Sequence, residues 1–360
     1  MVAPLKELYS PEFVSRLGAA LAARHGAFSA SRFRKTVFDA SWEQRELKAR
    51  MRHINLCMQR ELAMPYVEAL NVLVDVAPQF GSLPAMVFPD YVETHGLEHW
   101  QPSMRALACF TRYSSSEFAV RPFLLRDAPR MLKQMLAWSR DDDEHLRRLA
   151  SEGSRPRLPW AMALPEFKRD PAPVLPLLDQ LRADPSPYVR RSVANHLNDI
   201  AKDHPDITLE WARRWRDSHP HTDWIIKHGC RSLLKRAHPR ALDLFAYARA
   251  AHVGVRRLQL ESAELCIGDD LNFEVQLSGQ PRLGRLRIEY GIDFVKANGR
   301  HARKIFKLAE GEYGESARSF RKRHSLRQMT TRRHFAGRHR LAIIVNGETL
   351  KERVFTLSEN

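Results

Sequence analysis

The residues with the clearest potential for chemistry surround a stiff connector in the middle of the chain. A predicted helix ends at Ser151-Glu152-Gly153, and the segment Ser154-Arg155-Pro156-Arg157-Leu158-Pro159-Trp160 follows. Prolines restrict the backbone around Trp160, so the direction of this side chain is fixed. The simpler interpretation is a surface loop pinned by a buried indole. The alternative is a functional loop, because a plain helical repeat would not need such a connector.

Two further carboxylates stand where ordinary helix chemistry also explains them. Asp199 follows Arg191 and Asn195 at four-residue spacing in the helix predicted to begin near Pro187. Residues at this spacing share one face of a helix and can be an ordinary solvated face with i,i+4 pairing. If this face lines a groove, it offers a carboxylate and a cation at the same depth. Glu117 comes after three serines at a predicted helix start, where its charge most simply stabilises the helix terminus.

A run of basic residues in the last quarter of the chain favours contact with phosphates. Arg318, Arg321, Lys322 and Arg323 come close together, and five more arginines follow: Arg327, Arg332, Arg333, Arg338 and Arg340. A solvated strand edge explains two or three such charges, whereas this many indicates counterion release from a polyanion. The run carries no information about base sequence, because specificity needs contacts with base edges.

Charge and composition narrow the class of protein. The 360 residues carry a net charge of +16, and about half of this excess lies beyond residue 255. Such a field attracts nucleic acid first and an anionic membrane surface second. The four scattered cysteines favour a reducing compartment without a structural metal. The first residues lack an apolar signal segment, and no stretch of the sequence runs eighteen apolar residues. We therefore expect a cytoplasmic protein with no membrane partner.

The elements that position these residues change type once along the chain. Up to about residue 250 the apolar spacing is helical, with roughly a dozen helices. Ser10 predicts one helix start, and Ser41 with Gln44 predicts a capping box that opens a long helix. Residues 146–150 and 189–194 are similar and lie 43 residues apart, which is typical of HEAT repeats, whose helix pairs stack into a solenoid.

Beyond Gly254 the hydrophobic period becomes two. Apolar residues alternate with polar ones in segments 271–277, 286–292 and 341–345, and about seven such strands suit an immunoglobulin-like sandwich. Cys266 has no partner for the usual inter-sheet disulfide. We therefore predict a mainly α protein, with a HEAT-like α-helical solenoid in residues 1–253 and a basic immunoglobulin-like β-sandwich in residues 254–360.

Two stretches of this sequence resemble one family, the AlkC branch of the AlkD-like DNA glycosylases. They are residues 146–160, Leu-Arg-Arg-Leu-Ala-Ser-Glu-Gly-Ser-Arg-Pro-Arg-Leu-Pro-Trp, and residues 192–199, Ser-Val-Ala-Asn-His-Leu-Asn-Asp. The order of domains agrees as well, so the resemblance covers nearly the whole chain. It implies hydrolytic excision of cationic N-alkylated bases, especially 3-methyladenine and 3-methylcytosine, from double-stranded DNA in base excision repair, without flipping the nucleotide.

The resemblance also implies roles for single residues. Glu152 and Asp199 face the deoxyribose and orient the water, Glu117 supports them, and Trp160 presents its π-face to the cationic nucleotide. Phosphates beside the lesion are held by Arg148, Arg155 and Arg191. The sandwich clamps the DNA from the other side through its basic run. No metal and no organic cofactor is expected, and the protein is expected to be a monomer.

Two other classes of function stay open at this stage. The solenoid and sandwich could form a non-catalytic DNA or RNA scaffold in which the acids are surface charges. A protein-interaction solenoid of the transport-receptor type should have an acidic or apolar concave face, which the net charge disfavours. Strand cleavage would need a positioned, desolvated lysine, and the candidate stretches contain arginine instead, so we expect a monofunctional enzyme.

Overall fold

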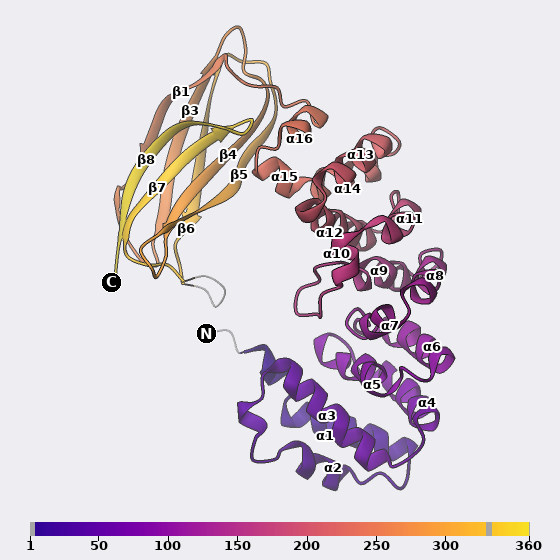
Figure 1. Ribbon diagram of the computed structural model, residues 1–360. Helices are drawn as coiled ribbons and strands as arrows, with labels where there is room; N and C mark the ends of the chain where they lie inside the picture. Colours follow the sequence, from indigo (N-terminus) through magenta and orange to yellow (C-terminus); the bar gives the residue numbers. More distant parts are fainter. Residues whose placement is uncertain (1–3, 329–332, 360) are drawn as a thin grey trace. The chain divides into compact units, whose positions relative to one another are not determined.

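The computed structural model describes residues 4–328 and 333–359, so Arg332 lies outside the described part of the chain. Within it lie sixteen α-helices and eight strands (Figure 1). The chain divides into two compact units. One comprises Met1–His204 with Trp215–Gly229, and the other comprises Pro205–Arg214 with Cys230–Asn360. No helix in the described ranges combines the length and apolarity needed to cross a bilayer.

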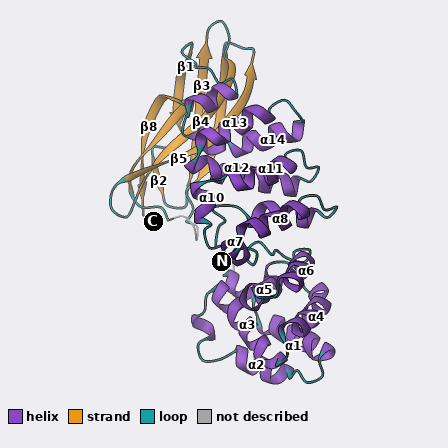
Figure 2. Cartoon of the chain, turned by 45° about the vertical axis from the view of Figure 1, so that its right-hand side comes forward, coloured by secondary structure: helices purple, strands orange, loops and turns teal. Residues whose placement is uncertain are grey.

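The first unit consists of helices that pack side by side (Figures 1 and 2). They are α1 (Pro11–Arg24), α2 (Ala30–Val37), α3 (Leu47–Leu62), α4 (Tyr66–Val76), α5 (Val87–His95), α6 (Trp100–Phe110), α7 (Arg121–Arg126), α8 (Ala128–Trp138), α9 (Glu144–Gly153), α10 (Pro165–Arg169), α11 (Leu175–Gln180), α12 (Pro187–Asp203) and α14 (Pro220–Gly229). Helix α12, which carries Asp199, packs against α9, which carries Glu152, and also against α14.

Helix starts follow the predicted capping pattern in one place and depart from it in another. Ser10 caps α1, and its side chain accepts a hydrogen bond from the Phe13 amide. The capping box predicted at Ser41 is wrong, because Ser41 precedes only a short 3-10 helix. Asp39 accepts a hydrogen bond from the Ser41 amide and binds the Arg45 guanidinium. Arg45 is therefore extended, and the long helix α3 begins only at Leu47.

The similarity between residues 146–150 and 189–194 corresponds to repeated contacts in the structure. Arg147 in α9 donates through Nη1 to the carbonyls of Asp141 and Asp142, six and five residues before it. Arg190 in α12 donates to the carbonyls of residues 184 and 185, which have the same spacing. These arginines tie the turn before each helix to its first turns. The HEAT-like repeat is therefore visible in hydrogen bonds as well as in sequence.

The second unit contains a two-layer sandwich and three helices. The helices are α13 (Pro205–Trp215), α15 (Arg231–Lys235) and α16 (Pro239–Leu244), and the strands are β1 (Val253–Leu260), β2 (Glu264–Cys266), β3 (Asp270–Gly279), β4 (Gly284–Val295), β5 (His301–Tyr313), β6 (Ala317–Ser325), β7 (Gly337–Val345) and β8 (Glu348–Ser358). One sheet has the order β1-β3-β6 and the other β2-β8-β7-β4-β5. Only the short β2 among these strands pairs in parallel, with β8.

The sandwich core follows the predicted alternation. Leu271, Phe273, Val275 and Leu277 of β3 are buried, and their polar neighbours in the strand are only half-buried. Cys266 is a free thiol, as predicted. The mainly α fold class with a C-terminal immunoglobulin-like sandwich is therefore confirmed. Helix α16 ends at Leu244 and β1 begins at Val253, whereas the compact units divide the chain earlier. The boundary between residues 253 and 254 stays a prediction.

Candidate active site

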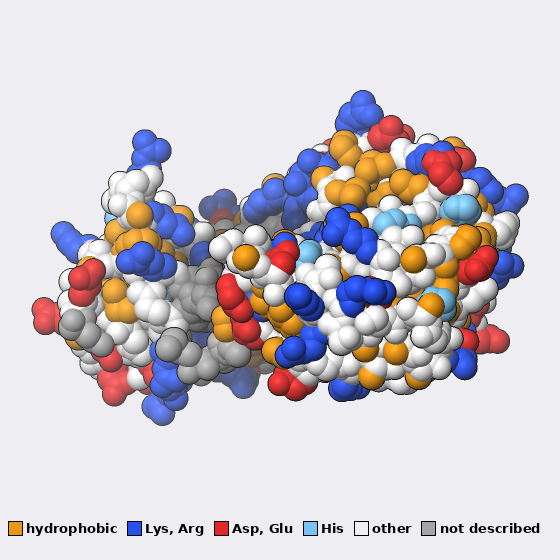
Figure 3. Space-filling view, turned by 90° about the horizontal axis from the view of Figure 1, so that it is seen from below, with side chains coloured by type: hydrophobic (Ala, Val, Ile, Leu, Met, Phe, Trp, Pro, Cys, Tyr) orange, Lys and Arg blue, Asp and Glu red, His pale blue; other side chains and the backbone are white. Residues whose placement is uncertain are grey.

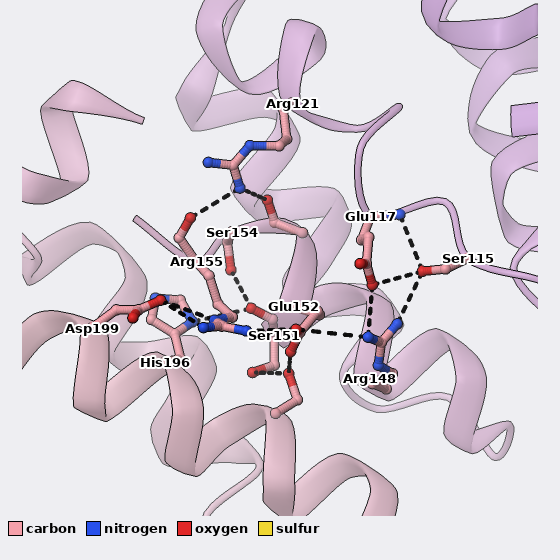
Figure 4. Close-up of polar contacts among 12 residues, drawn as sticks. Ser115, Glu117, Arg121, Arg148, Ser151, Glu152, Ser154, Arg155, His196 and Asp199 are labelled. Carbon is pink, nitrogen blue, oxygen red and sulfur yellow. Dashed lines mark hydrogen bonds and ion pairs between the residues drawn. The ribbon is translucent and has the colours of Figure 1, made fainter. Parts of the chain in front are cut away.

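Five side chains of alternating charge form one connected row in the first unit (Figure 4). In order along the row they are Glu117, Arg148, Glu152, Arg155 and Asp199. They come from the turn before α7, from α9, from the connector and from α12. The three carboxylates that the sequence singled out therefore lie in a single cluster, together with two of the predicted arginines.

Asp199 is the most deeply buried carboxylate of the row, with 2% of its surface exposed. Arg155 contacts its Oδ2 through both Nε and Nη2, each at 2.9 Å. The ammonium of Lys202, one turn further along α12, donates to Oδ1 at 3.0 Å. Lys202 is exposed, so Asp199 has a buried cation on one oxygen and a solvent-accessible cation on the other.

Glu152 lies at the end of α9 and is 6% exposed. Its Oε1 accepts a hydrogen bond from Arg155 Nη1 at 2.7 Å, and its Oε2 accepts one from the Ser192 hydroxyl at 2.6 Å. Ser192 belongs to α12 and also lies 3.0 Å from the Ser151 hydroxyl. The carboxylate is therefore fixed by side chains from two helices and the connector, which gives it a single orientation.

Glu117 closes the other end of the row and is the more accessible acid. Its Oε2 lies 2.6 Å from Arg148 Nη2 and accepts a hydrogen bond from Ser115. Its Oε1 makes no hydrogen bond within the described residues. The Arg148 guanidinium lies 4.9 Å from the centre of the Tyr188 ring, which restricts its movement. The simple expectation that Glu117 caps a helix does not describe these contacts, because α7 begins only at Arg121.

The arginines of the row stay charged although they are buried. Burial acts to lower the pKa of Arg155, but Glu152 and Asp199 outweigh it, so the pKa of this guanidinium is raised. The same balance raises the pKa of Arg148, where Glu117 and Glu152 outweigh burial. Each of these two guanidinium groups therefore lies between two carboxyl groups of the row.

Trp160 stands on the connector with 62% of its surface exposed, so the interpretation of a buried indole is wrong. The buried anchors of the connector are Leu158 and Leu164. Trp160 has a left-handed backbone with φ of +65°, which is unfavourable for a large side chain. Lys48 of α3 donates to its carbonyl at 3.1 Å. The indole is therefore exposed to solvent and accessible to a ligand.

The remaining predicted cations lie outside the row. Arg191 is exposed on α12. Arg318, Arg321, Lys322 and Arg323 lie on β6, where successive side chains point to opposite faces of the sheet. Arg321 and Arg323 share the outer face with Glu274 and Asp270, their ion-pair partners, whereas Arg318 lies against the Tyr313 and Phe320 rings. Figure 3 shows Lys and Arg side chains spread over one face of the molecule, with acids between them.

Sequence reasoning missed three polar residues that support the row. Arg121 and His196 are completely buried, and Ser192 binds Glu152. Burial lowers the pKa of His196 to about 3, so its imidazole is neutral. A signal for Arg121 does exist in the sequence, because a charge within the apolar run 118–125 must find buried partners. The sequence does not say which partners these are.

Comparison with known proteins agrees with this architecture in both parts of the chain. Residues 110–235 match a family described as DNA alkylation repair enzyme. Residues 254–359 match one described as the C-terminal Ig-like domain of the uncharacterised protein YhaZ. Fold and site together define a DNA alkylation repair protein that combines helical repeats with an immunoglobulin-like domain.

Two full-length relatives identify the branch. The chain is 47% identical over 348 residues to the uncharacterized protein YhaZ of Bacillus subtilis (strain 168), covering 96% of this chain and 97% of that protein. Its structure is similar to that of Pseudomonas fluorescens alkylpurine DNA glycosylase AlkC bound to DNA containing an abasic site analog. The TM-score is 0.94 and the identity 39%, over 99% of this chain and 100% of that chain. The chain belongs to the AlkC branch of the AlkD-like DNA glycosylase family.

Proposed function

We propose that this protein is a monofunctional DNA glycosylase that hydrolyses the N-glycosidic bond of cationic alkylated bases, 3-methyladenine and 3-methylcytosine among them. The observation that carries the proposal is the row that holds Glu117, Glu152 and Asp199 together, with the exposed Trp160 on the connector that also carries Arg155. Membership of the AlkC branch supports the same reaction. The proposed partner is double-stranded DNA, bound by a monomer and read without flipping the damaged nucleotide.

The chemistry of the substrate matches what the row offers. An alkylated base carries a positive charge, so the bond between C1′ and the base nitrogen breaks with its electron pair leaving on a neutral base. The sugar becomes an oxocarbenium-like cation, water adds to C1′, and a proton is released. Fixed carboxylates stabilise that developing positive charge, most strongly where water is excluded. Glu152 and Asp199 are buried and are held in one orientation by their arginine partners.

We assign the carboxylates different parts in this reaction. Glu152 and Asp199 stabilise the sugar cation, and together they orient the attacking water. Glu117 supports them, and its Oε1 is an acceptor without a partner in the described residues that can hold a water proton. Trp160 offers its π-face to the cationic base, an attraction worth about 0.5–2 kcal/mol. His196 would donate no proton in this reaction, because its pKa of about 3 leaves the imidazole neutral at neutral pH.

DNA binding would use cations outside the buried row. Arg191 and Lys202 are exposed on α12, and Arg321 and Arg323 are exposed on β6. Surface ion pairs such as those of Arg321 and Arg323 contribute little, so a phosphate can replace their partners. Arg155 is 7% exposed and directed at two carboxylates, which supports a role in orienting the acids. Its predicted contact with a phosphate stays a prediction.

Release of methylated bases from duplex DNA by the purified protein tests the proposal directly. The expected result is free 3-methyladenine together with an abasic strand that breaks only after alkali treatment, because a monofunctional enzyme leaves the backbone intact. Methylated duplex without protein is the control for spontaneous loss. Binding to the duplex without base release would instead support the non-catalytic scaffold, and strand cleavage without alkali would contradict a monofunctional reaction.

A further inference from the structure

A completely buried arginine lies next to the row without belonging to it. Arg121 opens α7 and has 0% of its surface exposed. None of its contacts within the described residues is an ion pair. Its guanidinium instead donates to three backbone carbonyls. Nη1 lies 3.0 Å from the carbonyl of Gly153 and 2.9 Å from that of Arg155 (Figure 4), and Nε lies 2.6 Å from the carbonyl of Met162.

Two of these carbonyls, those of Gly153 and Met162, flank the connector, and the third lies within it. Gly153 ends α9 directly after Glu152, Arg155 carries the guanidinium between the two buried acids, and Met162 follows Trp160 by two residues. One planar group with fixed donors therefore joins the two ends of the loop. A lysine at this position could not make the same contacts, because its ammonium is a point charge without the planar fork of donors that a guanidinium has.

The packing around Gly153 shows that this junction is tight. A Cβ atom added at Gly153 would lie 2.5 Å from Cγ2 of Val120, the residue before Arg121. The end of α9 and the start of α7 are therefore in van der Waals contact, and the buried guanidinium closes the space beside them. A movement of α7 relative to α9 would shift Glu152 and the connector together.

Burying the charge of Arg121 costs desolvation energy, and a charged side chain is not needed to fill this space. Burial lowers the pKa of its guanidinium to about 10, as does the nearby Arg155, whereas Glu117, Asp199 and Glu152 act in the opposite direction. The group is still charged at neutral pH. A neutral side chain could fill the same volume without desolvating a charge, so the donors and the charge are the features that need an explanation.

We propose that Arg121 is a positioning residue of the glycosylase site, which fixes the connector through three carbonyls and thereby sets Arg155 between Glu152 and Asp199 and Trp160 against the base. This inference rests on the proposed function. Arg121 does not touch the reacting atoms and acts through the loop. A misplacement of about 1 Å at a catalytic group costs on the order of a hundredfold in rate, so the loss of this residue should appear in catalysis.

The test compares Arg121→Gln and Arg121→Lys with the wild type and with Arg126→Gln. Arg126 lies on the same helix but at the surface, where it pairs with Glu98. Single-turnover base release is measured at saturating enzyme, and affinity is measured with duplex DNA containing an abasic analogue. Hydrogen exchange of the peptide spanning residues 154–164 reports on the connector without any DNA, and thermal melting reports on the fold.

We expect both Arg121 variants to melt cooperatively, to exchange faster in residues 154–164 and to lose on the order of a hundredfold in maximal rate, with affinity changed less than threefold. Arg126→Gln should match the wild type. A wild-type rate in both Arg121 variants, unchanged exchange in the connector, or loss of the melting transition in both would overturn the proposal. If the wild type releases no base, the proposed function fails, and the exchange data still decide whether Arg121 holds the connector.

Discussion

Arg155 and Asp199 lie 44 residues apart in the sequence and meet with Nε 2.9 Å from Oδ2. The same guanidinium reaches Glu152, so one cation joins two acids that come from successive repeats. Removing it takes the shared buried cation from two buried carboxylates, leaving Asp199 with Lys202 and Glu152 with Arg148 and Ser192, and the loss of one partner of a buried ion pair is strongly destabilising.

Arg155→Met should therefore reduce both stability and base release. We expect a loss of about 3–5 kcal/mol in unfolding free energy, because both acids remain buried after losing the cation that they share. Denaturant unfolding monitored by circular dichroism measures the change. Arg157→Met is the matched control, since Arg157 pairs with Asp203 near the surface and should cost about 1 kcal/mol or less. Equal effects of the two substitutions would show that the bridge does not support the acids.

Trp160 should matter for catalysis and not for stability. Its indole is exposed, so Trp160→Ala should leave the melting temperature nearly unchanged while base release falls about tenfold, as expected if a cation–π attraction near the upper end of its range is removed. Trp160→Phe should keep part of the rate because it retains a ring. Trp224→Ala removes another exposed indole as a control. A large drop in melting temperature for Trp160→Ala would mean that the ring holds the connector.

The outer face of β6 should contribute to the salt dependence of DNA binding. Replacing Arg321 and Arg323 by Gln should lower the slope of log affinity against log salt by about 1 for each phosphate that the protein no longer neutralises. Arg318→Gln should have a smaller effect, because Arg318 lies on the aromatic rings of Tyr313 and Phe320. Affinity for undamaged duplex at several salt concentrations measures the slopes. A slope unaffected by the double substitution would remove β6 from the DNA interface.

The hydrophobic period predicts the helical and strand regions because burial sets it directly. In α12 the apolar residues Val189, Val193, Leu197 and Ile200 recur at three- and four-residue spacing, and all four are buried. The similarity at 43-residue spacing also places α9 and α12 in neighbouring repeats, which is why Glu152 and Asp199 come together. The hydrophobic period therefore predicts the helices, and the 43-residue similarity predicts how two of them stack.

The polar contacts of the site depend on features that the period does not contain. The partners of Arg121 are backbone carbonyls at both ends of a loop, and nothing in the residue types around them specifies that pairing. The basic run illustrates the same limit, because Lys322 and Arg321 are adjacent in sequence yet lie on opposite faces of β6. Charge density alone therefore predicts a phosphate surface but not which side chains form it.

His196 should make the protein sensitive to acid. Burial lowers its pKa from 6.5 to about 3, so the unfolded chain binds a proton that the folded chain does not. This stability contribution is complete above pH 6.5 and is lost as the pH falls towards 3. His196→Asn should be less stable at pH 7.5 but lose less on going to pH 5, by thermal melting. The exposed His219→Asn should retain the wild-type pH dependence, and equal slopes for wild type and His196→Asn would contradict this origin.

The central claim is that buried carboxylates stabilise a cationic sugar, and single-turnover excision of 3-methyladenine by Asp199→Asn and Glu152→Gln tests it most directly. Each substitution keeps the shape and removes the negative charge. We expect a rate loss of a hundredfold or more, about 3 kcal/mol, with cooperative melting and most of the DNA affinity retained. Wild-type rates in both variants, or rates lost together with the melting transition, would contradict the account.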